Sequence, residues 1–172
     1  PKGSFEEKPV VPPVKVETSK INGKWRLLVD GQELYIKGAA CNNFYAEAAD
    51  FGANVIRTYG VSDNSRAILD AAYENGLYVN FGLYVKRETD GFDYNNTAAV
   101  KAQFDEMKTA VERFKDHPAL LLWSIGNEAE ASYTNLKLWD AINDIAKMIH
   151  ETDPNHPTTT TLASSNINHI KN

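Results

Sequence analysis

Several features are scarce in this sequence of 172 residues, and each absence excludes a class of protein. There is one cysteine, Cys41, so no disulfide can form within the chain. No apolar run reaches the roughly 18 residues that a membrane-spanning helix needs, so we expect no membrane partner. Basic residues do not outnumber acidic ones, and the net charge of −5 argues against a nucleic-acid partner. The four histidines lack metal-ligand spacing, which predicts no metal site.

A glycine-rich phosphate loop is also missing. Residues 38–43, GAACNN, follow the first predicted strand of the main domain, where a dinucleotide-binding protein has G-x-G-x-x-G. We therefore predict no nucleotide cofactor and no other cofactor. The apolar content of 42% and the charged content of 24% are typical of a globular domain with an apolar core, and the length suits one such domain.

The N-terminal part of the chain divides into two predicted segments. Residues 1–13 are polar and rich in proline, which predicts a linker or tail. The first residue is proline rather than methionine, so we expect either a processed product, from which a signal peptide was removed, or an expressed piece of a longer chain. Residues 14–34 hold short strand-like runs separated by Asn22-Gly23 and Asp30-Gly31, pairs that suit hairpin turns. They predict a β-meander, which we expect to cover the N-terminal end of the main domain.

From residue 35 the sequence alternates between strand-like and helix-like patterns. The predicted strands cover residues 35–41, 55–59, 77–85, 119–123 and 158–163. The predicted helices cover residues 45–51, a segment after a cap at Ser62 or Asp63 up to residue 75, and residues 97–115 and 135–151. This alternation predicts an α/β fold with a parallel sheet, either doubly wound or part of a barrel.

The stretch from residue 117 to 130 carries the strongest functional signal. His117-Pro118 ends a helix, and the continuous apolar run 119–123 is typical of a strand buried on both faces. The run leads into Asn127 and Glu128, so an amide and a carboxylate follow the end of a buried strand. In a β/α barrel, catalytic side chains lie at this end of the strands.

These residues resemble a known family. Residues 117–128, HPALLLWSIGNE, resemble the fourth barrel strand of clan A retaining glycosidases, in particular glycoside hydrolase family 2, which contains β-galactosidases and β-glucuronidases. The resemblance implies a TIM-type (β/α) barrel, with Glu128 as the general acid/base and Asn127 binding the sugar 2-hydroxyl. Residues 54–60, NVIRTYG, resemble the second strand of these enzymes, and the resemblance implies that Arg57 orients the nucleophilic carboxylate.

Other residues at predicted strand tips are candidates for lining a sugar-binding cleft. The candidate substrate-binding residues, besides Asn127 and Arg57, are Asn42, Asn43, Tyr59 and Tyr84. Two aromatic residues in the loop after the third strand, Phe92 and Tyr94, either stack on sugar rings or pack at the edge of the domain. Trp123 lies inside a buried strand, which favours a role in barrel packing.

The sequence departs from the family at the nucleophile. Retaining hydrolysis needs two carboxyl groups about 5–5.5 Å apart. In the family the nucleophile follows the seventh strand. Residues 14–172 predict only a partial barrel of about five strands, preceded by the β-meander of residues 14–34, and Glu130 stands too soon after Glu128 to take the role of nucleophile. We therefore expect a partial barrel that carries the acid/base half of the site and is inactive alone. Its open sheet edges predict self-association.

Three interpretations remain at this point. The first is a retaining β-glycosidase fragment acting on an oligo- or polysaccharide, for which the family favours a secreted or periplasmic location. The second is a non-catalytic half-barrel that binds carbohydrate, and the third is an unrelated α/β protein in which Asn127-Glu128 is incidental. The pH dependence of sugar binding separates the first two, because a working general acid titrates above the value of about 4.3 for a free glutamate.

Overall fold

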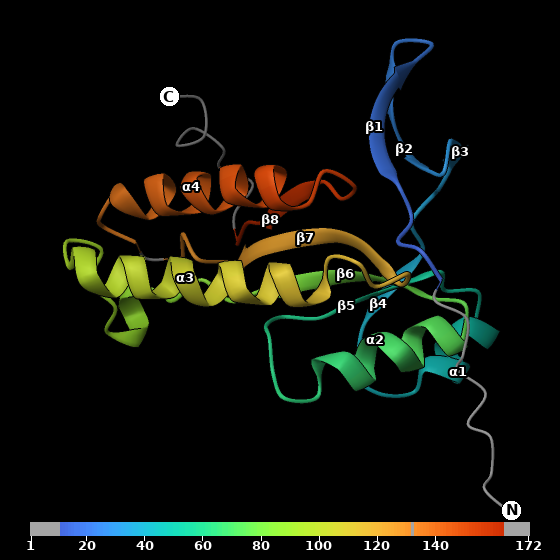
Figure 1. Cartoon of the computed structure of the whole chain (residues 1–172), viewed down its shortest axis with the longest axis horizontal. Coiled ribbons are helices and arrows are strands. Elements are labelled where there is room, and N and C mark those ends of the chain that lie inside the picture. Colours follow the sequence, from blue (N-terminus) through green and yellow to red (C-terminus); the bar gives the residue numbers. More distant parts are fainter. Residues whose placement is uncertain (1–10, 132, 164–172) are drawn as a thin grey trace, which may run out of the picture.

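The computed structural model describes residues 11–131 and 133–163 (Figure 1). The predicted linker lies mostly outside these residues, and so does the tail after residue 163. The elements are, in order, β1 (Val16–Ile21), β2 (Lys24–Val29), β3 (Gln32–Glu33), β4 (Gly38–Ala40), α1 (Tyr45–Asp50), β5 (Val55–Arg57), α2 (Ser65–Glu74), β6 (Tyr78–Leu83), the 3-10 helix η1 (Glu88–Asp90), α3 (Thr97–Phe114), β7 (Leu120–Asn127), α4 (Lys137–Thr152) and β8 (Thr158–Thr161). Among the described helices, none has both the length and the apolarity to span a membrane.

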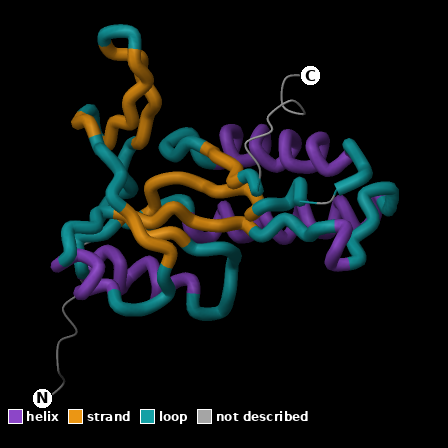
Figure 2. Tube along the Cα trace, turned by 180° about the vertical axis from the view of Figure 1, so that it is seen from behind, coloured by secondary structure: helices purple, strands orange, loops and turns teal. Residues whose placement is uncertain are grey.

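The main sheet has five parallel strands in the order β4-β5-β6-β7-β8. Each strand is added beside the previous one on the same side, whereas a doubly wound sheet reverses its direction at a switch point. An arc built in this way is a segment of a (β/α) barrel. Figure 2 shows its strands from the side that the helices do not cover. The predicted fold is therefore confirmed: a partial TIM-type barrel with an N-terminal antiparallel meander, β1-β2-β3.

β7 lies at the centre of the core. Every residue from Leu120 to Gly126 is buried, as the continuous apolar run predicted. Trp123 is fully buried and meets Phe81 of β6 edge to face, with ring centroids 5.5 Å apart. The buried faces of α3 and α4 complete this cluster through Met107, Val111, Phe114, Leu138, Ile142, Ile145 and Ile149. Trp123 therefore packs inside the domain, as predicted.

Some predicted boundaries are wrong, and local side-chain bonds explain them. The first barrel strand begins at Gly38 rather than residue 35, because the Lys37 N–H donates to Asn54 Oδ1 instead of joining the ladder. β3 covers two residues only, and Tyr35 is left exposed. α2 begins at Ser65, later than the predicted cap, and the Ser65 hydroxyl accepts a hydrogen bond from the Ser62 N–H.

The meander covers the barrel end only at its base. Val16 and Val29 pack in one apolar cluster with Val55 and Leu121, close to where β5 and β7 begin. The tip of the β1–β2 hairpin projects away from the barrel sheet (Figure 1), and Trp25 on it is 71% exposed. The expectation that the meander covers the N-terminal end of the main domain therefore holds for its base and not for its tip.

A buried carboxylate ties three parts of the barrel together. Asp153, in the turn between α4 and β8, accepts hydrogen bonds from the Trp123 indole (2.7 Å), from His156 Nδ1 (2.8 Å) and from the Asn155 N–H (3.1 Å). Burial alone would raise the pKa of Asp153, but the hydrogen bonds from His156 and Trp123 outweigh it and hold this pKa below its usual range. The ionised carboxylate therefore stabilises the fold.

We predict that Asp153→Asn lowers the free energy of unfolding at pH 7 by about 3 kcal/mol, because a buried carboxylate that accepts from three polar donors is lost. The stabilisation is fully present above the ordinary aspartate pKa of about 3.9 and is lost as the pH falls below it toward the lowered folded value. Urea unfolding measured from pH 7 down to pH 3 tests both statements.

The matched control is Asp144→Asn, on the exposed side of α4. Asp144 faces only Lys147 at 3.7 Å with both side chains exposed, so its loss costs less than about 0.5 kcal/mol. Equal effects of the two substitutions would contradict a special role for Asp153.

Candidate active site

The side chains that follow β5 and β7 meet at the C-terminal edge of the parallel sheet. Arg57 ends β5 and Asn127 ends β7, 70 positions later in the sequence. Arg57 Nη2 donates a hydrogen bond of 2.7 Å to Asn127 Oδ1. β6 lies between the two strands, so the Arg57 side chain crosses over it to reach Asn127. Two residues that the sequence singled out separately are therefore bonded to each other.

The rest of the Arg57 guanidinium is only partly satisfied. Its Cζ lies 4.9 Å from the ring centre of Tyr59, a cation–π contact. Arg57 Nε is buried and has no hydrogen-bond partner among the described residues. An unpaired buried donor costs about 1–3 kcal/mol, so this nitrogen is a position where an acceptor is favoured.

The tip of β5 has its shape because of Gly82. The Gly82 N–H donates to the Thr58 hydroxyl at 3.0 Å, and a side chain at Gly82 would overlap the Thr58 carbonyl oxygen and lie 2.6 Å from the Tyr59 carbonyl carbon. The chain therefore turns over β6 after Thr58, whose N–H still donates to the Asn80 carbonyl at 3.1 Å, and β5 ends at Arg57, whereas the sequence predicted a strand to residue 59. This turn places Tyr59 beside Arg57.

Glu128 stands directly after β7 on a sharply turned backbone. Gly126 has a φ of 77° and Glu128 a φ of 51°, left-handed values that a glutamate adopts rarely. The Glu128 N–H donates to the Thr161 carbonyl at 2.8 Å, which ties this turn to the end of β8. The side chain is exposed. Non-glycine residues held in this region concentrate at functional sites, where the surrounding structure compensates for the strain.

The other candidate residues lie at the same edge with different partners. Asn42 and Asn43 are exposed just after β4, and no hydrogen bond joins either to Arg57 or Asn127. Tyr84, after β6, is 41% exposed and donates its hydroxyl to Asp90 Oδ2 at 2.6 Å. This bond raises the pKa of Tyr84 and, together with Arg87, holds the pKa of Asp90 at about 2.

One of the predicted sugar-stacking aromatics is ruled out. Tyr94 is only 2% exposed, its ring meets Phe92 edge to face, and its hydroxyl donates to the Lys86 carbonyl. Burial raises the pKa of Tyr94 to about 12. Tyr94 therefore fixes the loop after β6 from the inside, and Phe92, which is half-buried against it, packs at the edge of the domain.

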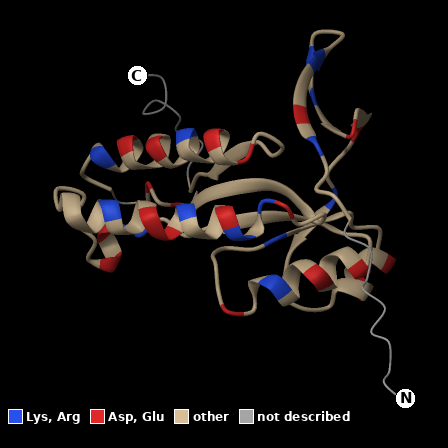
Figure 3. Ribbon diagram, viewed as in Figure 1, with Lys and Arg blue, Asp and Glu red and all other residues tan. Residues whose placement is uncertain are grey.

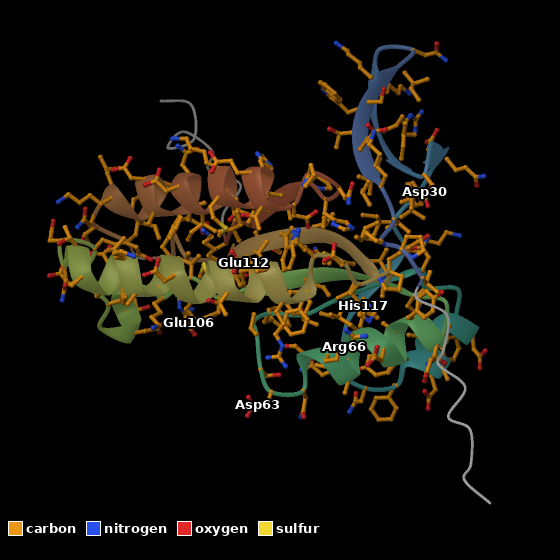
Figure 4. All side chains as sticks on the ribbon, in the orientation of Figure 1. Asp30, Asp63, Arg66, Glu106, Glu112 and His117 are labelled. Atoms are coloured by element: carbon orange, nitrogen blue, oxygen red, sulfur yellow. The ribbon has the colours of Figure 1, made fainter. Side chains whose placement is uncertain are left out.

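Several other acidic residues belong to other parts of the fold. Figure 4 shows Asp30 beside the meander, Asp63 before α2, and Glu106 and Glu112 along α3. Along α3 and α4 both signs of charge are interspersed (Figure 3), so these two helices present no uniformly basic surface. Among the described residues, no three His, Cys, Asp or Glu side chains are grouped to hold a metal ion.

The two buried histidines each face one carboxylate. His117 Nε2 lies 3.1 Å from Asp70 Oδ1, while its Nδ1 accepts from the Ala119 N–H. Burial lowers the pKa of His117 despite the contact with Asp70. His156 contacts Asp153 through its Nδ1 instead, at 2.8 Å, and its buried Nε2 has no hydrogen-bond partner among the described residues. Both histidines therefore join neighbouring elements in the fold.

Sequence comparison decides the family. The sequence model of the family described as "Glycosyl hydrolases family 2, TIM barrel domain" matches residues 49–170. The chain belongs to glycosyl hydrolase family 2. A β-galactosidase from Arthrobacter sp. (strain B7) is 32% identical over 110 residues, covering 58% of this chain and 10% of the relative. β-Galactosidase BgaC from Bifidobacterium adolescentis is 25% identical over 160 residues, covering 76% and 14%.

Solved structures of family 2 members share the fold. The β-D-glucuronidase from Dictyoglomus thermophilum superposes with a TM-score of 0.67 at 20% identity, over 90% of this chain and 29% of its own. A family 2 member from Bacteroides cellulosilyticus gives 0.68 at 19% identity, over 92% and 22%. The chain thus spans less than a third of these structures and about a tenth to a seventh of the curated relatives.

We predict that Gly82→Ala lowers the free energy of unfolding by about 2 kcal/mol, because backbone atoms of Thr58 and Tyr59 must move to admit the methyl group. The NMR signals of the Arg57 guanidinium should shift as well, since the β5 tip positions it. Gly60→Ala is the milder control, because its methyl group would lie 3.2 Å from the Tyr84 Cβ, a contact that a shift of a few tenths of an ångström relieves. An unchanged Arg57 signal in Gly82→Ala would contradict this account.

Proposed function

We propose that this chain supplies the acid/base half of a retaining β-glycosidase site whose substrate is an oligo- or polysaccharide. The single observation that carries the proposal is the hydrogen bond from Arg57 Nη2 to Asn127 Oδ1, one residue before Glu128. It fixes the amide that the family resemblance assigns to the sugar 2-hydroxyl. Because the Asn127 carbonyl oxygen accepts from Arg57, its amide N–H groups are left to donate to a sugar oxygen.

The position of Glu128 suits a general acid. Its carboxyl is exposed at the tip of β7, next to Asn127, so a glycosidic oxygen can approach it. In the first step of retaining hydrolysis the acid protonates the leaving oxygen, and in the second the same group, now ionised, takes a proton from water. The bond from the Glu128 N–H to the Thr161 carbonyl fixes the backbone from which this side chain extends.

The free side of Arg57 supports a place for the second carboxylate. Arg57 Nε is buried without a partner, although Nη2 is used by Asn127. A carboxylate that accepts from this nitrogen would be held ionised, as a nucleophile must be. The described residues offer no such group beside Arg57. In the proposed site the nucleophile is therefore a carboxylate from outside this chain, one that follows the seventh strand of a complete barrel. The chain alone is then inactive.

We predict that Glu128→Gln reduces hydrolysis of alkyl glycosides about 10²–10⁴-fold. The substitution is tested in a longer polypeptide that also contains the carboxylate following the seventh strand of the complete barrel. Aryl glycosides with acidic phenol leaving groups should lose much less in the first step, because such a phenolate leaves without a proton. Steady-state kinetics over a series of leaving groups measures the difference.

Glu130→Gln is the matched control. Glu130 follows Glu128 by two positions, but its Oε1 accepts from the Ala163 N–H at 2.5 Å and so joins the β7–α4 loop to the chain after β8. The Glu130→Gln substitution should not change how the rate of hydrolysis depends on the leaving group. Turnover by the 172-residue chain alone that is lost in Glu128→Gln would overturn the proposed division of the site.

A carbohydrate-binding half-barrel is the second candidate function. Tyr59 and Tyr84 are 47% and 41% exposed at adjacent strand tips, and aromatic side chains of this kind can stack on sugar rings. Tyr94, which the sequence also offered, is buried and cannot take part. Sugar binding by the chain that is lost in Tyr59→Ala but unchanged in Glu128→Gln would favour this function over the catalytic one.

The open edges of the arc lead to a prediction about assembly. β4 and β8 are the terminal strands of the five-stranded sheet, and all of β4 is exposed. Unpaired strand edges pair with other chains, so we expect the 172-residue chain to self-associate at tens of micromolar. Thr159→Lys, on exposed β8, should weaken association, whereas Thr109→Lys on the exposed side of α3 should not. A monomeric mass in light scattering would contradict the prediction.

A further inference from the structure

The segment that follows Glu128 is held by a residue from the neighbouring loop. Glu88 Oε2 accepts hydrogen bonds from the Thr134 N–H at 2.6 Å and the Asn135 N–H at 3.0 Å. Glu88 Oε1 accepts from the Thr134 hydroxyl at 2.9 Å. One carboxylate thus binds three donors of two consecutive residues, just before α4 begins. The contact joins the loop after β6 to the loop after β7, across 46 positions of sequence.

Glu88 is itself on a fixed support. Glu88 is the first residue of η1. Arg87, just before this helix, and Asp90, its last residue, are joined by hydrogen bonds from the Arg87 N–H and guanidinium to the Asp90 carboxylate. Asp90 also accepts the Tyr84 hydroxyl, which ties η1 to the residue after β6. The root of this loop is anchored on α3, because Gln103 Oε1 accepts from the Lys86 N–H at 2.8 Å. Through Glu88, residues 134 and 135 are therefore held in a fixed position relative to β6 and α3.

A short path leads from the bound segment back to Glu128. The Ala131 N–H donates to the Glu128 carbonyl at 3.0 Å, and the Tyr133 N–H donates to the Glu130 carbonyl at 3.3 Å. The two turns overlap in the sequence and link Glu128 to Tyr133, the residue before Thr134. A bond that fixes Thr134 therefore limits how far Glu128 can turn from its left-handed φ of 51°.

We propose that Glu88 is a positioning residue, a latch between the loops after β6 and β7 that holds the backbone of Glu128 in its left-handed conformation and so fixes the direction of its carboxyl. The proposal rests on the proposed function only for the role of Glu128 in the reaction. Glu88 acts through Thr134 and Asn135.

The charge state of Glu88 suits a latch that stays closed. The N–H groups of Thr134 and Asn135 and the Thr134 hydroxyl hold the pKa of Glu88 below its usual range, against a small opposing effect of desolvation. The carboxylate is therefore ionised at and above the ordinary glutamate pKa of about 4.3, where it offers its full set of acceptors.

The experiment uses NMR on the ¹⁵N,¹³C-labelled 172-residue chain, with Glu88→Ala and Glu88→Gln as variants. Two readouts are recorded: amide hydrogen exchange at Thr134 and Asn135, and the Cα and amide shifts of Glu128, which report its backbone conformation. Glu106→Ala is the matched control. Glu106 is an exposed glutamate on α3 whose carboxylate faces Lys86 Nζ at 3.8 Å.

The latch predicts that Glu88→Ala speeds exchange at Thr134 and Asn135 by about fivefold or more and moves the Glu128 shifts toward ordinary extended values. Glu88→Gln keeps one carbonyl acceptor and should give an intermediate change at both places. Glu106→Ala should change neither. This graded effect, with partial rescue by the conservative variant, supports the proposal.

Two results would overturn the proposal. Unchanged exchange at Thr134 and Asn135 in Glu88→Ala would show that the latch does not hold the segment. Faster exchange with unchanged Glu128 shifts would show that Glu88 stabilises the loop without positioning Glu128. Neither readout uses turnover, so a failure of the proposed function, judged by hydrolysis in Glu128→Gln, is distinguished from a failure of the latch.

Discussion

The burial of β7 on both of its faces is the constraint on which the rest of the structure depends. α3 and α4 cover one face, β1 and β2 contact the start of the strand, and no residue from Leu120 to Gly126 is left exposed. A slip by one residue would turn every side chain of the strand, Trp123 among them, to the opposite face of the sheet. The position of the strand end is therefore fixed. Gly126 makes the turn there with its φ of 77°, and Asn127 and Glu128 lie at the edge of the sheet, where Arg57 donates to Asn127.

The sequence predicted well those elements whose signal is an apolar pattern. α3 was correctly placed, and β7 was correctly identified as a buried strand, because burial on two faces and burial on one helical stripe leave different periodicities. β7 continues to Asn127, past the predicted end at residue 123. β4 was predicted too long, because it is an edge strand and little of it is buried. Its first residue is set by the hydrogen bond from the Lys37 N–H to Asn54 Oδ1. A local sequence pattern cannot predict a hydrogen bond between residues 17 positions apart.

The candidate site was predictable to the extent that it lies on strand tips. Apolar runs precede Arg57, Asn127 and Glu128, which indicated that these residues lie at the ends of buried strands. The family resemblance indicated the same strand ends, and β5 and β7 do end there. For Tyr94 the sequence left two alternatives open, sugar stacking or packing, because an aromatic residue in a polar loop has the same sequence signature whether it faces solvent or the core. Its burial decides for packing. Glu88 was missed for a similar reason: its partners lie 46 and 47 positions away, and only the fold brings them together.

The inner face of the arc differs from the outer one in its chemistry. Arg57 pairs in register with Asn80, and Ser124 follows on the same face of β7. Arg57 Nε, Asn80 Oδ1 and Ser124 Oγ are all buried without hydrogen-bond partners among the described residues. Each such atom costs about 1–3 kcal/mol, so an apolar cover would leave the cost in place, whereas water or polar side chains remove it. Two copies of this arc are therefore unsuited to packing inner face against inner face as the sheets of an apolar sandwich do, and contact between copies is favoured at the strand edges, where backbone groups satisfy one another.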